Sequence, residues 1–304
     1  MKTPIFEGIM SVVVTPFDRQ GRIDLGVLGR QLDFLLENGV HWIVPGGTTG
    51  EYYAQSVEER KQVLSFVAEH VGTRAELAAG TNSARPAETV ELSAHAKGLG
   101  YKALMLAAPY YSLPTTDELA AHFRAMAGET GMPIILYNFP ARTGVDMTPD
   151  FLRSVVDMPA ICAIKESSGS FARMLELVLH FDGQLQRICG ADDQAVDSFL
   201  WGARSWIAGA SNFLPAEHVA LYEACVVRKD FVLGQKLMRA MLPVFYLLEQ
   251  GGKYIQYVKY GCELAGLPVG TTRGPLMPLS DAEKAQFRSL YEGVKAAGLD
   301  KLAA

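Results

Sequence analysis

Residues 161–169 read ICAIKESSG: four small or apolar residues, a lysine, a glutamate and a turn-forming end. A short apolar run closed by such residues is typical of a buried strand, which here ends at Lys165. A lysine at the mouth of a buried strand loses contact with water. This disfavours its ammonium form, so that its neutral amine can attack a carbonyl group. Lys165 is therefore a candidate Schiff-base nucleophile; alternatively, it is an ordinary strand-end lysine that extends into solvent.

The same kind of apolar run recurs along the first two thirds of the chain. The predicted strands cover residues 9–14, 42–45, 75–79, 103–107, 133–137, 161–165, 186–190 and 205–208. Helix-like segments lie between them, and Ser56 with Glu59 and Thr115 with Glu118 have the capping-box spacing of helix starts. Eight strand–helix alternations without a clear linker predict an α/β protein, a TIM (β/α)8 barrel. A doubly wound open sheet is the alternative, but no GxGxxG follows the first strand.

The strand pattern ends near residue 215. The segments 216–228, 231–249, 253–265 and 282–297 all have helical patterns, and a Ser280/Glu283 capping box precedes the last of them. We therefore expect two units: residues 1–214 form the (β/α)8 barrel, and residues 215–304 form a C-terminal helical extension.

Composition excludes several classes of function. The chain has 304 residues, 49% hydrophobic and 20% charged, which suits a globular protein with a large core. The net charge is −5 and no Lys/Arg run is present, so a nucleic-acid partner is not expected. The amino terminus lacks the apolar stretch of a signal peptide, no uninterrupted apolar run has membrane-spanning length, and the four cysteines are far apart. These features predict a cytoplasmic protein without a membrane partner. The six histidines lack HxxxH or HExxH spacing, so no metal is expected.

Residues that follow different strands of a βα barrel meet on one face, so reactive side chains after several strands are expected to share one pocket. Residues 45–51 read PGGTTGE, residues 109–112 read PYYS and residues 137–144 read YNFPARTG. Glycine-rich turns let backbone N–H groups approach an anion. A phenol such as Tyr137 can transfer protons, with Thr48 as a relay. The geometry of the Arg142 guanidinium fits a carboxylate in a two-point contact. Each motif also has an ordinary interpretation: a tight turn, surface aromatics or a solvated charge. Their joint occurrence on strand ends of one predicted barrel favours a site.

Three of these motifs together resemble a known family. GGTTGE at 46–51, YNFPARTG at 137–144 and IKE at 164–166 are similar to the dihydrodipicolinate synthase / N-acetylneuraminate lyase family of class I aldolases. The likeness extends from about Ile5 to the end of the chain and includes GADD at 190–193 and the helical tail.

The resemblance implies a role for each matching residue. Lys165 would form an imine with the keto carbon of pyruvate or another 2-oxo acid, so that this covalent imine takes the place of a cofactor. Tyr137 would shuttle protons. Thr48 would link Tyr137 to Tyr111, which in this family usually comes from the neighbouring subunit of a homotetramer built as a dimer of dimers.

The resemblance also implies how substrates bind. Thr49 and the backbone N–H groups of its loop, which contains Gly47, would hold the carboxylate of the 2-oxo acid, and the backbone at Ile207 would line the same pocket. Arg142 would hold the carboxylate of the second substrate, an aldehyde or carboxylate compound.

Three functions remain open. The first is condensation of pyruvate with aspartate semialdehyde, as in 4-hydroxy-tetrahydrodipicolinate synthases, and the RTG setting of Arg142 favours it. The second is a catabolic reaction by a 2-oxo-3-deoxy sugar acid aldolase or dehydratase, or by a hydroxyproline-pathway deaminase. It is indicated by Ser112-Leu113 and by residues 253–259, which replace motifs usual in synthases. The third is a non-catalytic 2-oxo acid binding protein, which is disfavoured because a complete proton relay is present.

Overall fold

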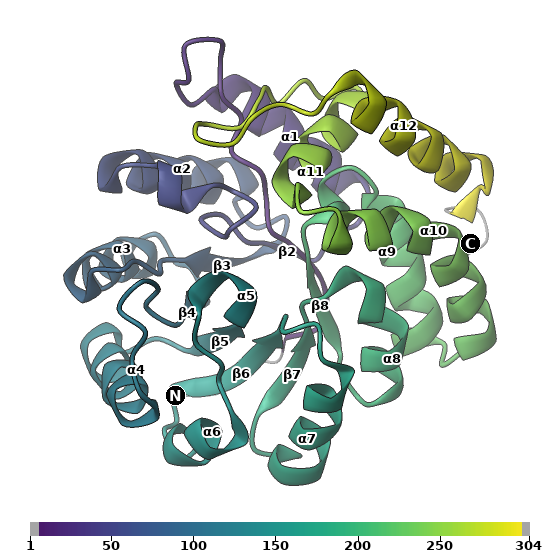
Figure 1. The fold of residues 1–304 in the computed structure, drawn as a ribbon. Coiled ribbons are helices and arrows are strands. Elements are labelled where there is room, and N and C mark those ends of the chain that lie inside the picture. Colours follow the sequence, from purple (N-terminus) through teal and green to yellow (C-terminus); the bar gives the residue numbers. More distant parts are fainter. Residues whose placement is uncertain (1–5, 300–304) are drawn as a thin grey trace.

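The protein is a closed barrel of eight parallel strands surrounded by helices, in a computed structural model that describes residues 6–299 (Figure 1). The strands are β1 (Gly8–Ser11), β2 (Trp42–Ile43), β3 (Glu76–Gly80), β4 (Ala103–Ala107), β5 (Ile134–Asn138), β6 (Ile161–Glu166), β7 (Gln186–Cys189) and β8 (Ser205–Ala208). Each strand pairs with the next, and β8 pairs with β1 to close the ring. The predicted TIM (β/α)8 barrel is confirmed and the open sheet is wrong.

The barrel helices lie between and after the strands, and two of them begin directly after the predicted capping residues Ser56 and Thr115. They are α1 (Leu25–Glu37), α2 (Val57–Val71), α3 (Pro86–Gly98), α4 (Thr116–Thr130), α5 (Pro140–Thr143), α6 (Pro149–Val155), α7 (Phe171–Phe181) and α8 (Ala195–Leu200), with the short helices η1 (Tyr52–Ala54), η2 (Asp192–Gln194) and η3 (Ala210–Asn212). Ser56 and Thr115 each accept a hydrogen bond from the backbone N–H three residues on, and the carboxylates of Glu59 and Glu118 accept hydrogen bonds from the backbone N–H groups of Ser56 and Thr115. Both capping boxes therefore satisfy N–H groups that the helix cannot pair itself.

A helical extension follows the barrel and carries a Pro-containing long helix. Its elements are α9 (Pro215–Tyr222), η4 (Glu223–Val227), α10 (Phe231–Gln250), α11 (Tyr254–Leu264) and α12 (Asp281–Ala296). The predicted helices are confirmed, although the first changes from α to π geometry at Glu223. In Figure 1, α10, α11 and α12, coloured green to yellow, lie beside one another along the barrel's flank. The division into two units at residue 214 stays a prediction, and its segments 1–5 and 300–304 lie outside the described residues.

Helix α10 is long and apolar enough, by length and composition alone, to cross a membrane. Core helices of ordinary domains pass the same test. Lys236 and Arg239 interrupt its apolar sequence, and α10 packs against η2, α8, α9 and α12. Its buried side chains include Leu237, Met241 and Phe245, so its apolar face is used within the fold.

The barrel interior is filled with side chains rather than open. Met10, Val44, Met105, Ile135 and Ile188 form part of one buried cluster, and the Phe6 and Trp42 rings, whose centroids are 5.4 Å apart, belong to the same cluster. Such layers of apolar side chains are the usual core of a βα barrel. The solid interior leaves the carboxyl ends of the strands as the place for a pocket.

The four cysteines are buried and unpaired. Burial raises the pKa of the Cys162 and Cys189 thiols to about 12, so both are protonated at neutral pH. They pack as small apolar residues.

Candidate active site

Lys165 and Tyr137 face each other at the carboxyl ends of neighbouring strands. They are register partners in β6 and β5, so both side chains project to the same side of the sheet. Lys165 Nζ lies 4.1 Å from the centroid of the Tyr137 ring, and each residue is only 5% exposed. The alternative of a lysine extended into solvent is therefore wrong, and the amine and the phenol share one buried space.

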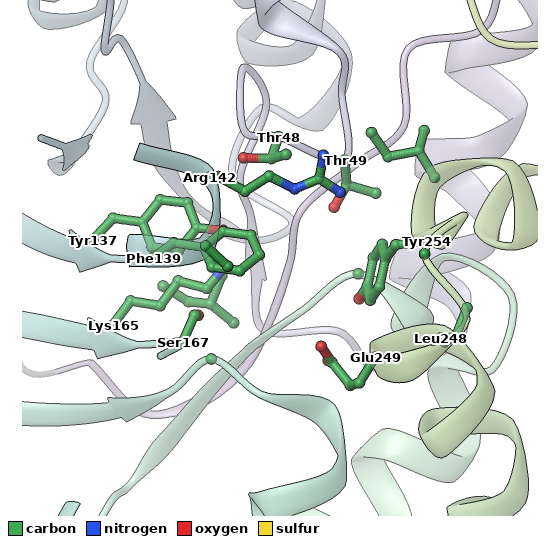
Figure 2. Close-up of a pocket in the computed structure, with 16 residues that line it drawn as sticks. Thr48, Thr49, Tyr137, Phe139, Arg142, Lys165, Ser167, Leu248, Glu249 and Tyr254 are labelled. Carbon is green, nitrogen blue, oxygen red and sulfur yellow. The ribbon is translucent and has the colours of Figure 1, made fainter. Parts of the chain in front are cut away.

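That space is a cavity of about 210 Å³ at the mouth of the barrel (Figure 2). Its lining includes six of the eight residues predicted for the site: Thr48, Thr49, Tyr137, Arg142, Lys165 and Ile207. The other lining residues include Phe139, Ser167, Gly190, Gly209, Glu249 and Tyr254. Strands distant in sequence thus bring an amine, a phenol, two threonine hydroxyls and a guanidinium to one small pocket.

Gly47 does not line this cavity, contrary to the prediction that it takes part in substrate binding. A Cβ at this position would lie 2.4 Å from Val12 Cγ1, behind the loop. Its neighbour Gly46 has φ +77° and would place a Cβ 2.3 Å from the carbonyl oxygen of Gly80. The two glycines are needed because the loop packs directly on the barrel. They bring Thr48 and Thr49 to the cavity without contacting it themselves.

A buried ion pair anchors the end of this loop to the C-terminal extension. Glu51, in the left-handed region at φ 56°, pairs with Lys259 of α11 at 2.5 Å and accepts a hydrogen bond of 2.9 Å from the backbone N–H of Arg273. Burial lowers the pKa of Lys259, and the Glu51 carboxylate opposes that shift. Two buried charges are tolerated only when each has a good partner. The extension therefore fixes the loop that carries Thr48 and Thr49.

Tyr111 does not reach the cavity of its own chain. Its side chain is 95% exposed and its backbone has φ 72°, while Leu113 two residues on is also exposed with φ 48°. Its neighbour Tyr110 instead lines a second cavity of about 290 Å³ that shares Thr48, Tyr137 and Arg142 with the first. The expectation that Tyr111 acts in a neighbouring subunit stays a prediction.

Arg142 lies at the rim, on the short helix α5 directly after β5. Its guanidinium carbon is 5.9 Å from the centroid of the Phe139 ring, and its side chain is exposed. Within residues 6–299 no acidic side chain forms an ion pair with it, so its charge is available to a ligand. A free guanidinium at a cavity mouth fits a carboxylate in a two-point contact.

Three cavity residues with polar side chains were not predicted: Ser167, Glu249 and Tyr254. The buried Ser167 hydroxyl has no hydrogen-bond partner among the described residues. Glu249 is the penultimate residue of α10, and Tyr254 begins α11. In the sequence, only a glutamate near the end of a largely apolar helix and a tyrosine in an altered motif distinguished Glu249 and Tyr254.

Behind Glu249 lies the buried carboxylate of Asp192, which is 1% exposed. It accepts hydrogen bonds from Trp206 Nε1 at 3.0 Å and from the Tyr254 hydroxyl at 2.6 Å. Burial raises the pKa of Asp192 to about 6, against these hydrogen bonds and the charge of Lys165. Burial and the charge of Asp192 raise the pKa of Glu249 to about 8. One proton is therefore held on this pair at neutral pH.

A lysine amine above a phenol, at the carboxyl-end mouth of a closed (β/α)8 barrel, defines a protein of the class I aldolase type. Residues 5–293 match the model of the Dihydrodipicolinate synthetase family, and the chain belongs to that family.

Similar proteins agree with this assignment. The chain is 33% identical to a 4-hydroxy-tetrahydrodipicolinate synthase of Exiguobacterium sp., over 95% of this chain and 98% of that one. It is 39% identical to a synthase of the same name from Pseudomonas putida, over 76% and 80%.

Solved structures of the family superpose along nearly the whole chain. The 4-hydroxy-tetrahydrodipicolinate synthase of Methylacidiphilum fumariolicum SolV has a TM-score of 0.93 at 31% identity, over 99% of this chain and 100% of that one. A chloride-inhibited dihydrodipicolinate synthase of Acinetobacter baumannii, complexed with pyruvate, has a TM-score of 0.90 at 30% identity, over 96% and 99%.

Proposed function

We propose that this protein is a 4-hydroxy-tetrahydrodipicolinate synthase, a Schiff-base lyase that condenses pyruvate with aspartate semialdehyde. The observation that carries the proposal is the Lys165 amine, buried 4.1 Å from the Tyr137 ring in a cavity with one free guanidinium. The names of the similar proteins support the same reaction.

The first stage is imine formation on Lys165. The neutral amine attacks the keto carbon of pyruvate, and the carbinolamine that forms loses water to give the imine. This stage needs a proton to reach the leaving oxygen, and in this proposal the Tyr137 hydroxyl supplies it, with Thr48 as the relay. The protonated imine then accepts electrons, so no separate cofactor is required.

The second stage is carbon–carbon bond formation. Tyr137, which gave up its proton in the first stage, takes a proton from C3 of the imine. The enamine that results attacks the aldehyde carbon of the second substrate with its electron pair. The carbonyl oxygen takes up a proton. The amino group of the second substrate then attacks the imine carbon, and cleavage of the carbon–nitrogen bond to Lys165 releases the cyclic product and the free amine. In the reverse sense, the same groups would cleave a longer 2-oxo acid.

The two carboxylates of the substrates bind at different places in this proposal. Thr49, with backbone groups near Ile207, holds the carboxylate of pyruvate inside the cavity, where both residues line the wall. Arg142 holds the carboxylate of aspartate semialdehyde at the rim, because its charge is not neutralised by a described residue.

Arg142→Ala is expected to raise the KM for aspartate semialdehyde about tenfold or more, because a charge-assisted contact contributes roughly 1.5–3 kcal/mol. The KM for pyruvate should change much less. Steady-state kinetics with each substrate varied in turn would measure both constants. Arg239→Ala, which removes an exposed arginine of α10, is the matched control. Equal effects of Arg142→Ala on both KM values would contradict its assignment.

A competing function is a catabolic aldolase, dehydratase or deaminase that uses the same imine. It is favoured by Tyr254, which belongs to the altered segment 253–259 and lines the cavity. Activity on pyruvate plus aspartate semialdehyde should be compared with activity on a panel of 2-oxo-3-deoxy acids. Turnover of the panel alone would replace the synthase proposal, and absence of any imine would indicate a binding protein.

We also propose a homotetramer, a dimer of dimers, in which Tyr111 enters the site of a neighbouring subunit. The exposed Tyr111 and Leu113 beside an aromatic-lined cavity support such a contact. Mixing inactive Lys165→Ala subunits with weakly active Tyr111→Phe subunits should restore activity, because some mixed sites contain both residues. Sedimentation and mass spectrometry would verify that subunits exchange. Mixed oligomers without recovered activity would show that Tyr111 acts within its own chain or not at all.

The cytoplasm is the proposed location, and neither nucleic acid nor a membrane is a proposed partner. The buried reduced cysteines and the net charge of −5 support this proposal.

A further inference from the structure

The cavity carries an acid that the proposed reaction does not yet use. Figure 2 shows Tyr137, Lys165 and Ser167 on one side of the pocket and Glu249 with Tyr254 on the opposite side. Glu249 comes from the last turn of α10. This helix packs against η2, whose first residue is Asp192. The C-terminal extension therefore contributes a carboxyl group to the wall that faces the nucleophile.

Hydrogen bonds make the two carboxyls of this pair different. Both oxygens of Asp192 accept hydrogen bonds, from Trp206 Nε1 and the Tyr254 hydroxyl, which favours its ionised form. The backbone N–H of Asp192 donates to Glu249 Oε1 at 3.1 Å and so fixes the orientation of that carboxyl. The other oxygen of Glu249 has no hydrogen-bond partner within the described part of the chain. It is the oxygen that a ligand in the cavity would meet.

The charges around Glu249 decide which form it takes. Asp192 and Asp193 of η2 both raise its pKa, Lys165 of β6 lowers it, and burial is the largest cause of the rise to about 8. Tyr254 of α11 lies on the same wall and is neutral, because burial and both carboxyls raise the pKa of its hydroxyl. Arg142 of α5 lines the same cavity. Between about pH 6 and pH 8, Glu249 is accordingly protonated beside an ionised Asp192.

We propose that Glu249 is a further catalytic acid, which hydrogen-bonds the aldehyde oxygen of the second substrate and protonates it when the carbon–carbon bond forms. The enamine electron pair makes the new bond, the carbonyl electron pair moves to oxygen, and that oxygen takes the proton of Glu249. Solvent then returns a proton to the Glu249 carboxylate. This step rests on the proposed aldol reaction at Lys165.

The neutral form of Glu249 also suits the charges of the substrates. Pyruvate is an anion and aspartate semialdehyde carries a carboxylate beside its ammonium group, and an ionised Glu249 would place a further negative charge in the small cavity that must receive both carboxylates. A protonated carboxyl avoids this repulsion and still offers a hydrogen bond. The same group is therefore compatible with anion binding only on the acidic side of its titration.

The test is the pH profile of kcat/KM for the second substrate in the wild type, Glu249→Gln and Glu249→Leu. The wild type should lose activity above about pH 8 as Glu249 ionises. Glu249→Gln, which retains a hydrogen-bond donor but no transferable proton, should be about tenfold slower and lack that part of the alkaline decline; Glu249→Leu should be about a hundredfold slower. Glu263→Gln, an exposed carboxyl in α11, is the control and should behave like the wild type.

Two further measurements separate the possible failures. Infrared difference spectra between pH 6.5 and 9.5 should show loss of a protonated carboxyl in the wild type but not in Glu249→Gln, whatever the substrate. Borohydride trapping of pyruvate on Lys165 should be unchanged in all variants. Failure of trapping in the wild type would overturn the proposed function, whereas normal trapping with an unaltered pH profile in Glu249→Gln, or a Glu249→Leu rate within twofold of the wild type, would overturn the role of Glu249.

Discussion

Lys165→Ala is expected to abolish turnover and to leave the fold intact. The substitution removes the only amine that lines the cavity among the described residues, and covalent catalysis has no substitute nucleophile there. The side chain beyond Cβ projects to the cavity rather than into the apolar layers of the barrel, so its loss opens no void in the core. We expect kcat to fall by about a thousandfold or more.

Borohydride reduction in the presence of pyruvate is the most direct measurement of this prediction. Peptide mass mapping of the wild type should place the added three-carbon group on the peptide that contains Lys165, and the variant should carry none. Lys102→Ala is the matched control, because Lys102 is exposed and directly precedes β4 at the opposite end of the barrel. Residual turnover of Lys165→Ala within tenfold of the wild type would refute the assignment of the nucleophile, and circular dichroism would establish that the variant is folded.

Tyr137→Phe is expected to slow imine formation about a hundredfold, which is the usual share of a positioned acid–base group. The variant keeps the ring that lies 4.1 Å from Lys165 Nζ and that stacks on Phe139 at 5.7 Å, so only the hydroxyl is lost. The effect therefore reports proton transfer rather than packing. Rapid-mixing measurement of the pyruvate imine in single turnover would isolate this stage from carbon–carbon bond formation.

Tyr110→Phe serves as the control for Tyr137→Phe. Tyr110 lines the neighbouring cavity with Tyr137 but not the cavity that contains Lys165. Its hydroxyl should have little influence on imine formation. An unchanged rate in Tyr137→Phe, or equal losses in the two variants, would show that another group transfers the proton.

Much of the site could be predicted because the barrel converts a sequence pattern into a spatial one. Tyr137 and Lys165 each end a short apolar run, and successive strands of a parallel barrel are neighbours. Their approach therefore follows from two local patterns and one rule of topology. The same reasoning placed Thr48, Thr49 and Arg142 at the mouth, since each lies in the loop or short helix after a strand.

Gly47 shows where the local pattern misled. A glycine-rich turn can offer backbone N–H groups to an anion, or it can allow close packing of a loop on a strand. A Cβ on Gly47 would lie too close to Val12, which is remote in the sequence, so the absence of a side chain at this position allows the loop to pack on the barrel. Composition of the turn was therefore insufficient to distinguish the two roles.

The strand ends, the helix caps and the succession of eight βα units are local in origin. Hydrophobic periodicity, capping residues and turn-forming residues act over a few neighbouring positions. The amino-acid sequence by itself was therefore enough to predict the barrel and the approach of Tyr137 to Lys165. The carboxyl pair of Asp192 and Glu249, and the contacts of Glu51 with the C-terminal extension, were decided only by the tertiary structure. Asp192 and Glu249 are 57 residues apart and Glu51 and Arg273 are 222 apart, and each pair meets only because the C-terminal extension packs against the barrel. The free energy of such a contact depends on burial and on distance in space, and neither quantity has a counterpart in sequence spacing.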